Sequence, residues 1–120
     1  MKVLSPRIHG YLDYVVVIVF LAAPMLLGLS GIPATIAYAL SVIHLLVTLL
    51  TDFPLGISKA IPIRLHSLIE FLVSLTLIAL PWLFGFASVV PARNFYIAAG
   101  IVIFIVWLLT DYHSSSVSSD

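Results

Sequence analysis

Residues 64–86 read RLHSLIEFLVSLTLIALPWLFGF, and no other segment shows the character of the chain so clearly. From residue 65 to residue 86 the segment is almost entirely apolar. This length matches the ~20 residues that a helix needs to cross the hydrocarbon core of a bilayer. His66 and Glu70 bring ionisable groups into the run, and both lie near its start. The segment therefore predicts a transmembrane helix with one polar end.

Three further apolar stretches of similar length accompany it, and the four together cover residues 10–29, 32–51, 65–86 and 95–110. The chain of 120 residues is 62% hydrophobic and 8% charged, whereas soluble domains are about 25% charged. Breaks rich in Gly and Pro separate the stretches at residues 30–33, 52–62 and 91–94. The composition excludes an ordinary soluble domain, and we expect an all-α, four-helix transmembrane bundle with up-down topology in a lipid bilayer.

The two halves of the chain repeat one pattern. An offset of 57 residues aligns Arg7 with Arg64, His9 with His66 and Asp13 with Glu70, and an offset of 59 aligns residues 51–53 (TDF) with residues 110–112 (TDY). The pattern predicts two tandem helical hairpins, residues 7–53 and 64–112, related by a pseudo-two-fold axis along the membrane normal. Residues 1–113 would form a single domain, followed by a disordered polar tail at residues 114–120.

The basic residues indicate an orientation. Four of them fall on the side shared by the termini and the loop between the second and third spans, and one falls on the other side; they are Lys2, Arg7, Lys59 and Arg64 against Arg93. The positive-inside rule then places both termini in the cytoplasm, in an inner or plasma membrane. No run of Lys or Arg suggests nucleic acid as a partner.

A short motif ends each odd-numbered span. Residues 80–86 read LPWLFGF, and residues 23–29 read APMLLGL as a degenerate counterpart. The first string resembles the signature of SPW-repeat membrane proteins, which have two helices per repeat. The chain departs from that signature because Leu80 and Ala23 replace its Ser and Met25 replaces one Trp. The resemblance implies the four-helix layout and no known reaction.

The candidate functional residues gather toward one end of the expected bundle. His9 with Asp13, and His66 with Glu70, are i,i+4 pairs, so each pair shares a helix face. A charge at the bilayer centre costs roughly 2.5–3.5 kcal/mol on insertion scales, so these side chains should point inward and be paired. Because the first and third helices lie diagonally in an up-down bundle, the two pairs should meet.

A metal site is the sharpest hypothesis for this end of the bundle. Two imidazoles and several carboxylates without any cysteine suit zinc, iron or manganese. Asp52 and Asp111, which close the second and fourth spans, would complete the ligand set. His44, whose repeat mate is Ile103, lies about 12 Å deeper than Asp52 and is a secondary ligand or proton handler. The carboxylates beside both histidines argue against haem.

Two alternatives remain open from the sequence. In the first, the charges form a structural ion-pair lattice, with Arg7 paired to Asp52 and Arg64 to Asp111, inside a non-enzymatic scaffold or accessory subunit. Such a protein would act as a homo-oligomer or within a larger membrane complex. In the second, the polar residues conduct protons or ions. No catalytic fingerprint indicates a reaction, so the sequence leaves enzyme activity undecided.

Overall fold

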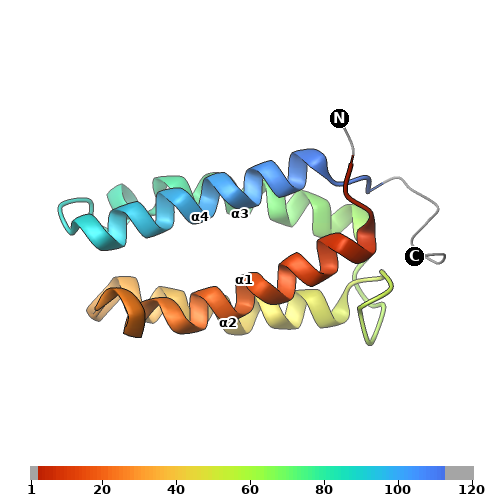
Figure 1. Ribbon diagram of the computed structural model, residues 1–120, viewed down its shortest axis with the longest axis horizontal. Coiled ribbons are helices and arrows are strands. Elements are labelled where there is room, and N and C mark those ends of the chain that lie inside the picture. The colour runs from red at the N-terminus through yellow and green to blue at the C-terminus, as the bar shows by residue number, and fades with distance from the viewer. Residues whose placement is uncertain (1–2, 113–120) are drawn as a thin grey trace.

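The computed structural model describes residues 3–112, and within that range all regular structure is helical. The four helices are α1 (Pro6–Leu27), α2 (Gly31–Leu50), α3 (Ile63–Leu83) and α4 (Val90–Leu109), shown in Figure 1. All four are long and apolar enough to cross a membrane. The expected all-α, four-helix transmembrane architecture is confirmed, and the chain is an integral membrane protein whose environment is a lipid bilayer.

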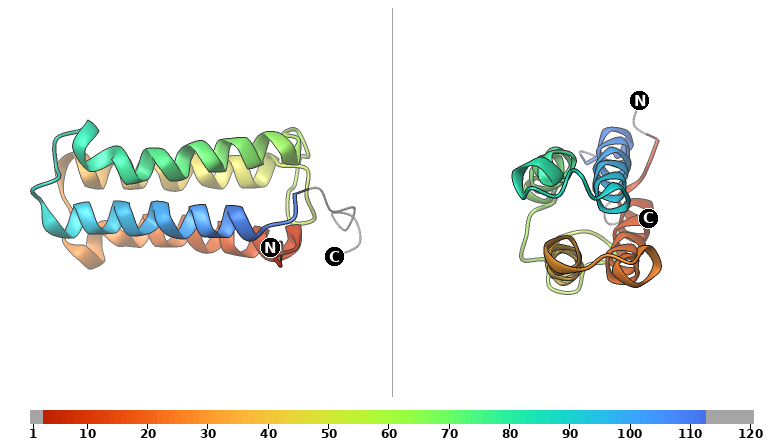
Figure 2. Two further views of the ribbon diagram at one scale, coloured as in Figure 1. Left: turned by 90° about the horizontal axis from the view of Figure 1, so that it is seen from above. Right: turned by 90° about the vertical axis from the view of Figure 1, so that its left-hand side faces the viewer.

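The helices run up and down in two hairpins, α1 with α2 and α3 with α4 (Figure 1). The end view in Figure 2 shows them at the corners of a square in chain order, so α1 lies diagonally across from α3. Packing is dense inside each hairpin and sparse between them. This arrangement is compatible with the pseudo-two-fold axis that the repeats predict.

Local sequence signals explain where the helices begin. Ser5 caps α1, because its side chain accepts a hydrogen bond from the N–H of Ile8, and Pro6 occupies the first helical position. The prediction of a break at residues 91–94 is wrong, because α4 already begins at Val90 and has Pro91 in its first turn. A proline at this position costs no helical hydrogen bond, so the helix starts five residues earlier than the apolar stretch.

The two hairpins use equivalent positions for a close contact between their helices. In the first hairpin, the Ser41 hydroxyl on α2 donates a hydrogen bond to the backbone oxygen of Val17 on α1, at 2.9 Å. In the second, Gly100 on α4 faces Ser74 on α3, and a Cβ at Gly100 would lie 2.7 Å from the Ser74 backbone oxygen. Small residues at both crossings let the helices pack tightly.

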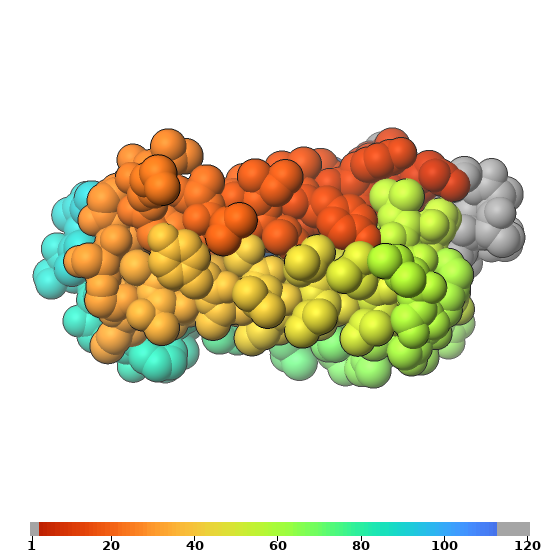
Figure 3. Space-filling view, turned by 90° about the horizontal axis from the view of Figure 1, so that it is seen from below, coloured from red at the N-terminus to blue at the C-terminus, as the bar shows by residue number. Residues whose placement is uncertain are grey.

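One end of the bundle holds the α1–α2 and α3–α4 connections, and its core is apolar and aromatic. Phe20 on α1 and Leu77 on α3 are buried there, together with Tyr96 on α4, whose hydroxyl donates to the Pro33 backbone oxygen on α2 at 2.6 Å. At the opposite end the loop between α2 and α3 folds over the bundle beside the start of α1 (Figure 3). Four buried ionisable residues, His9, Asp13, His66 and Glu70, lie at this end.

Candidate metal centre

Four ionisable side chains from the two diagonal helices meet at the loop-covered end of the bundle. His9 and Asp13 come from α1, and His66 and Glu70 come from α3. One potential ligand atom from each residue can be chosen so that all lie within 4.8 Å of one another. All four residues are at most 3% exposed. We call them the four-residue site, and their convergence agrees with the sequence expectation.

Each imidazole in the four-residue site faces both carboxylates. The Nε2 atom of His9 lies 3.2 Å from Asp13 Oδ1 and 2.5 Å from Glu70 Oε2. The Nε2 atom of His66 lies 3.1 Å from Asp13 Oδ2 and 3.2 Å from Glu70 Oε2. The i,i+4 contact within each helix is thus matched by a contact across the bundle, and the site joins the two hairpins.

Two threonines fix the orientation of the two histidines. His9 Nδ1 lies 2.8 Å from Thr110 Oγ1, and His66 Nδ1 lies 2.8 Å from Thr51 Oγ1. Each threonine already donates its single hydroxyl proton to the backbone oxygen one turn earlier in its own helix, at 2.6 Å. Each Thr oxygen therefore accepts, and each histidine carries a proton on Nδ1. In the neutral rings, both Nε2 lone pairs then point into the site.

The threonines themselves are held by backbone contacts between the repeats. Leu4, just before α1, bridges to Thr110, and Ile61, just before α3, bridges to Thr51. Leu4 and Ile61 are equivalent under the 57-residue offset, as are the two threonines under the 59-residue offset. The threonine that orients a histidine thus always comes from the other hairpin.

Two buried polar atoms in the site have no hydrogen-bond partner among the described residues, namely Asp13 Oδ2 and His66 Nε2. They lie 3.1 Å apart but are not aligned for a hydrogen bond. A shared metal ion would satisfy both atoms at once. Four N or O ligands placed tetrahedrally at zinc distances are about 3.3–3.5 Å apart, close to three of the four N–O separations in the site.

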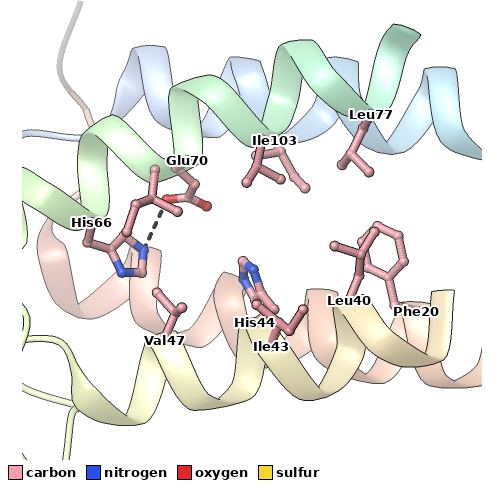
Figure 4. A pocket seen from close by; sticks show the side chains of 11 residues that line it. Phe20, Leu40, Ile43, His44, Val47, His66, Glu70, Leu77 and Ile103 are labelled. Atoms are coloured by element: carbon pink, nitrogen blue, oxygen red, sulfur yellow. Dashed lines mark ion pairs between the residues drawn. The ribbon is translucent and has the colours of Figure 1, made fainter. Parts of the chain in front are cut away.

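His44 joins the site from α2. Its Nε2 atom is 3.3 Å from Asp13 Oδ1, so it contacts a carboxylate of the four-residue site instead of standing apart in the bilayer. Its side chain is 14% exposed, against 2–4% for the side chains of the four-residue site. His44, His66 and Glu70 all line a cavity between α2 and α3, shown in Figure 4.

The structure does not bring Asp52 or Asp111 into the group, although the sequence suggested both as ligands. Each follows its threonine in extended backbone, where successive side chains point to opposite sides. The threonines are therefore buried, while Asp52 is exposed and Asp111 is half-buried. Within residues 3–112, Asp52 and Arg64 form no ion pair, so the expected Arg7–Asp52 and Arg64–Asp111 pairs do not form.

Tyr112, which the sequence analysis aligned with Phe53 without giving it a role, is a neighbour of the site. Its hydroxyl donates to Glu70 Oε2 at 3.1 Å, and its ring packs against His9. Burial raises the pKa of the Tyr112 hydroxyl, and the neighbouring Glu70 carboxylate raises it further, so Tyr112 stays a donor. Its repeat mate Phe53 packs against His66 without a hydroxyl. The Tyr/Phe mismatch was the available signal in the sequence.

No protein-family model matches the chain, and no curated protein or solved structure is similar enough to be matched to it. The resemblance to SPW-repeat proteins therefore stays a prediction. What the chain does has to be argued from the geometry of the site.

Proposed function

We propose that this integral membrane protein binds one divalent first-row metal ion, zinc, iron or manganese, through His9, Asp13, His66 and Glu70. The site would lie at the membrane face that carries the loop between α2 and α3. The distribution of basic residues favours the cytoplasmic side for this face. Two imidazoles and two carboxylates without thiolates form a donor set that suits these metals.

One observation carries the proposal, namely the hydrogen bonding of the two histidines on the side away from the site. Thr110 and Thr51 hold Nδ1 of His9 and His66, which leaves both Nε2 atoms as ligands. Metal-binding histidines almost always have their second nitrogen held by a hydrogen bond in this way. A structural ion-pair lattice would instead require a second proton on each ring and an aligned hydrogen bond from each Nε2 to a carboxylate. His66 Nε2 makes no hydrogen bond among the described residues.

The metal would join the two hairpins. Each hairpin supplies one histidine and one carboxylate, and contacts between the hairpins are otherwise sparse. Four protein ligands make a closed site of the kind that stabilises a fold. Ion conduction receives less support, because the far end of the bundle is filled by the apolar core around Phe20, Leu77 and Tyr96.

The test is the metal content of untagged protein purified in detergent, measured by elemental mass spectrometry after incubation with zinc, iron or manganese and desalting. Wild type should retain one ion per chain, and His66→Ala should retain none. Asp52→Asn is the matched control, because Asp52 is an exposed carboxylate outside the site and its loss should change nothing. Metal-free wild type after all three incubations, or equal metal in wild type and His66→Ala, would contradict the proposal.

A further inference from the structure

The bundle has two apolar cavities between its hairpins. The α2/α3 cavity has a volume of about 40 Å³, is partly open to the surface, and is lined by apolar side chains apart from His44, His66 and Glu70 (Figure 4). The α1/α4 cavity has a volume of about 350 Å³ and is lined entirely by apolar residues. Because α1 with α4 and α3 with α2 are equivalent pairs in the repeat, the two cavities are pseudo-symmetric.

His44 is the main chemical difference between the cavities. Leu40, Ile43 and Val47 in the α2/α3 cavity correspond to Ala99, Val102 and Val106 in the α1/α4 cavity, all apolar on both sides. His44 corresponds to Ile103. A polar ring therefore replaces an aliphatic side chain at this position of the α2/α3 lining, which also contains His66 and Glu70.

The contacts of His44 determine what its free nitrogen can bind. The Nε2 atom lies 3.3 Å from Asp13 Oδ1, and an ionised carboxylate only accepts, so Nε2 carries a proton. In the neutral ring Nδ1 is then an acceptor, and it has no hydrogen-bond partner among the described residues. Figure 4 shows the ring pointing from α2 into the cavity. Nδ1 thus offers a hydrogen-bond acceptor to the cavity, and a ligand with an O–H group would supply the donor.

We propose that the α2/α3 cavity binds the hydroxyl end of a lipid-soluble alcohol from the bilayer, and that this hydroxyl donates a hydrogen bond to His44 Nδ1. Because the cavity has a volume of only about 40 Å³, the hydrocarbon part would leave through its open side and lie in the lipid beside Ile43, which is 53% exposed. This inference goes beyond metal binding and does not require the metal, because the hydrogen-bonding atom belongs to His44.

Photolabelling in lipid nanodiscs tests the inference. The probes are a dodecanol that carries a diazirine near its hydroxyl and the corresponding methyl ether, which lacks the O–H donor. Labelled peptides are mapped by mass spectrometry, and the α1/α4 cavity of the same molecule is the internal control. One hydrogen bond predicts that the ratio of α2/α3 to α1/α4 labelling is about 2- to 12-fold higher for the alcohol than for the ether. Equal ratios would show that the cavity takes hydrocarbon chains without a donor, and would overturn the proposal.

Two variants make the test specific. His44→Ile gives the α2/α3 cavity the side chain of its pseudo-symmetric mate and should abolish the preference for the alcohol. His44→Gln keeps an oxygen acceptor and should retain part of it. A preference that survives in His44→Ile would also overturn the proposal. Metal content is measured on the same samples at saturating metal, so an alcohol preference without bound metal would refute the proposed function alone, and metal without the preference would refute this inference alone.

Discussion

At the loop-covered end, one set of polar residues occurs in both repeats, and a second set occurs in only one repeat each. Both supply a histidine, a carboxylate one turn later, and a threonine that orients the histidine of the other repeat. His44 and Tyr112 have no polar mate, because Ile103 and Phe53 stand at the equivalent positions. The comparison separates a duplicated set of candidate ligands, which fits the proposed shared metal, from single additions that make the two sides of the site different.

The duplicated set is also exchanged between repeats. His9 of the first hairpin depends on Thr110 of the second, and His66 depends on Thr51 of the first. Neither hairpin alone contains a complete histidine with its orienting partner. The site therefore requires both hairpins, which fits a metal that joins them.

The largest predicted effect follows from the equivalence of the two ligand histidines. His9→Ala and His66→Ala should each weaken zinc affinity by more than about 100-fold, beyond the range expected for outer-shell changes. Competition with a zinc-chelating dye measures the affinities. His44→Ile should reduce affinity much less, because His44 contacts only a carboxylate of the site. If one ligand histidine proved dispensable while the other was essential, the symmetric set would not be the site.

The orienting threonines should give the next largest effect. Thr51→Val and Thr110→Val keep the side-chain shape but remove the acceptor for Nδ1, so each should weaken zinc affinity by about 10- to 100-fold. Serine at either position should restore most of the affinity. Thr35→Val is the control, because that hydroxyl donates to the Gly31 backbone oxygen at the other end of the bundle. A loss of affinity in the control equal to that in the site variants would contradict the assignment.

The repeats also differ in packing at Gly10, and a substitution there tests this difference. A Cβ at Gly10 would lie 2.2 Å from Cε2 of Phe53, whereas the repeat mate of Gly10 is Ser67. Gly10→Ala should destabilise the protein by about 1–3 kcal/mol through overpacking, measured by thermal unfolding in detergent. Phe53→Leu in the same chain should recover part of the loss. Ile8→Ala, at an exposed position two residues earlier, serves as the control. Unchanged stability in Gly10→Ala would refute the close contact.

The smallest predicted effect comes from making the repeats more alike. Tyr112→Phe copies Phe53 and removes the hydrogen bond to Glu70, which should change zinc affinity by about 2- to 12-fold, the value of one hydrogen bond. The same dye competition measures it. Complete loss of metal in Tyr112→Phe would mean that the tyrosine is a ligand and would remove the distinction between duplicated and single residues.

The sequence predicted the helices and the meeting of the four-residue site because both follow from periodicity. Apolar runs of spanning length predict the helices, and i,i+4 pairs on repeated helices predict convergence across the bundle. The threonines were not identified, because their role depends on the extended backbone that follows α2 and α4. Alternation in that backbone buries Thr51 and Phe53 and exposes Asp52, whereas helical reasoning favoured the aspartate.

The most direct test of the shared metal site is X-ray absorption at the zinc edge on untagged, zinc-loaded protein. The account predicts a shell of four nitrogen or oxygen atoms at about 2.0–2.2 Å, with outer scattering from two imidazole rings. A shell of oxygen atoms without any imidazole in wild type would place the metal elsewhere on the protein and contradict the central claim.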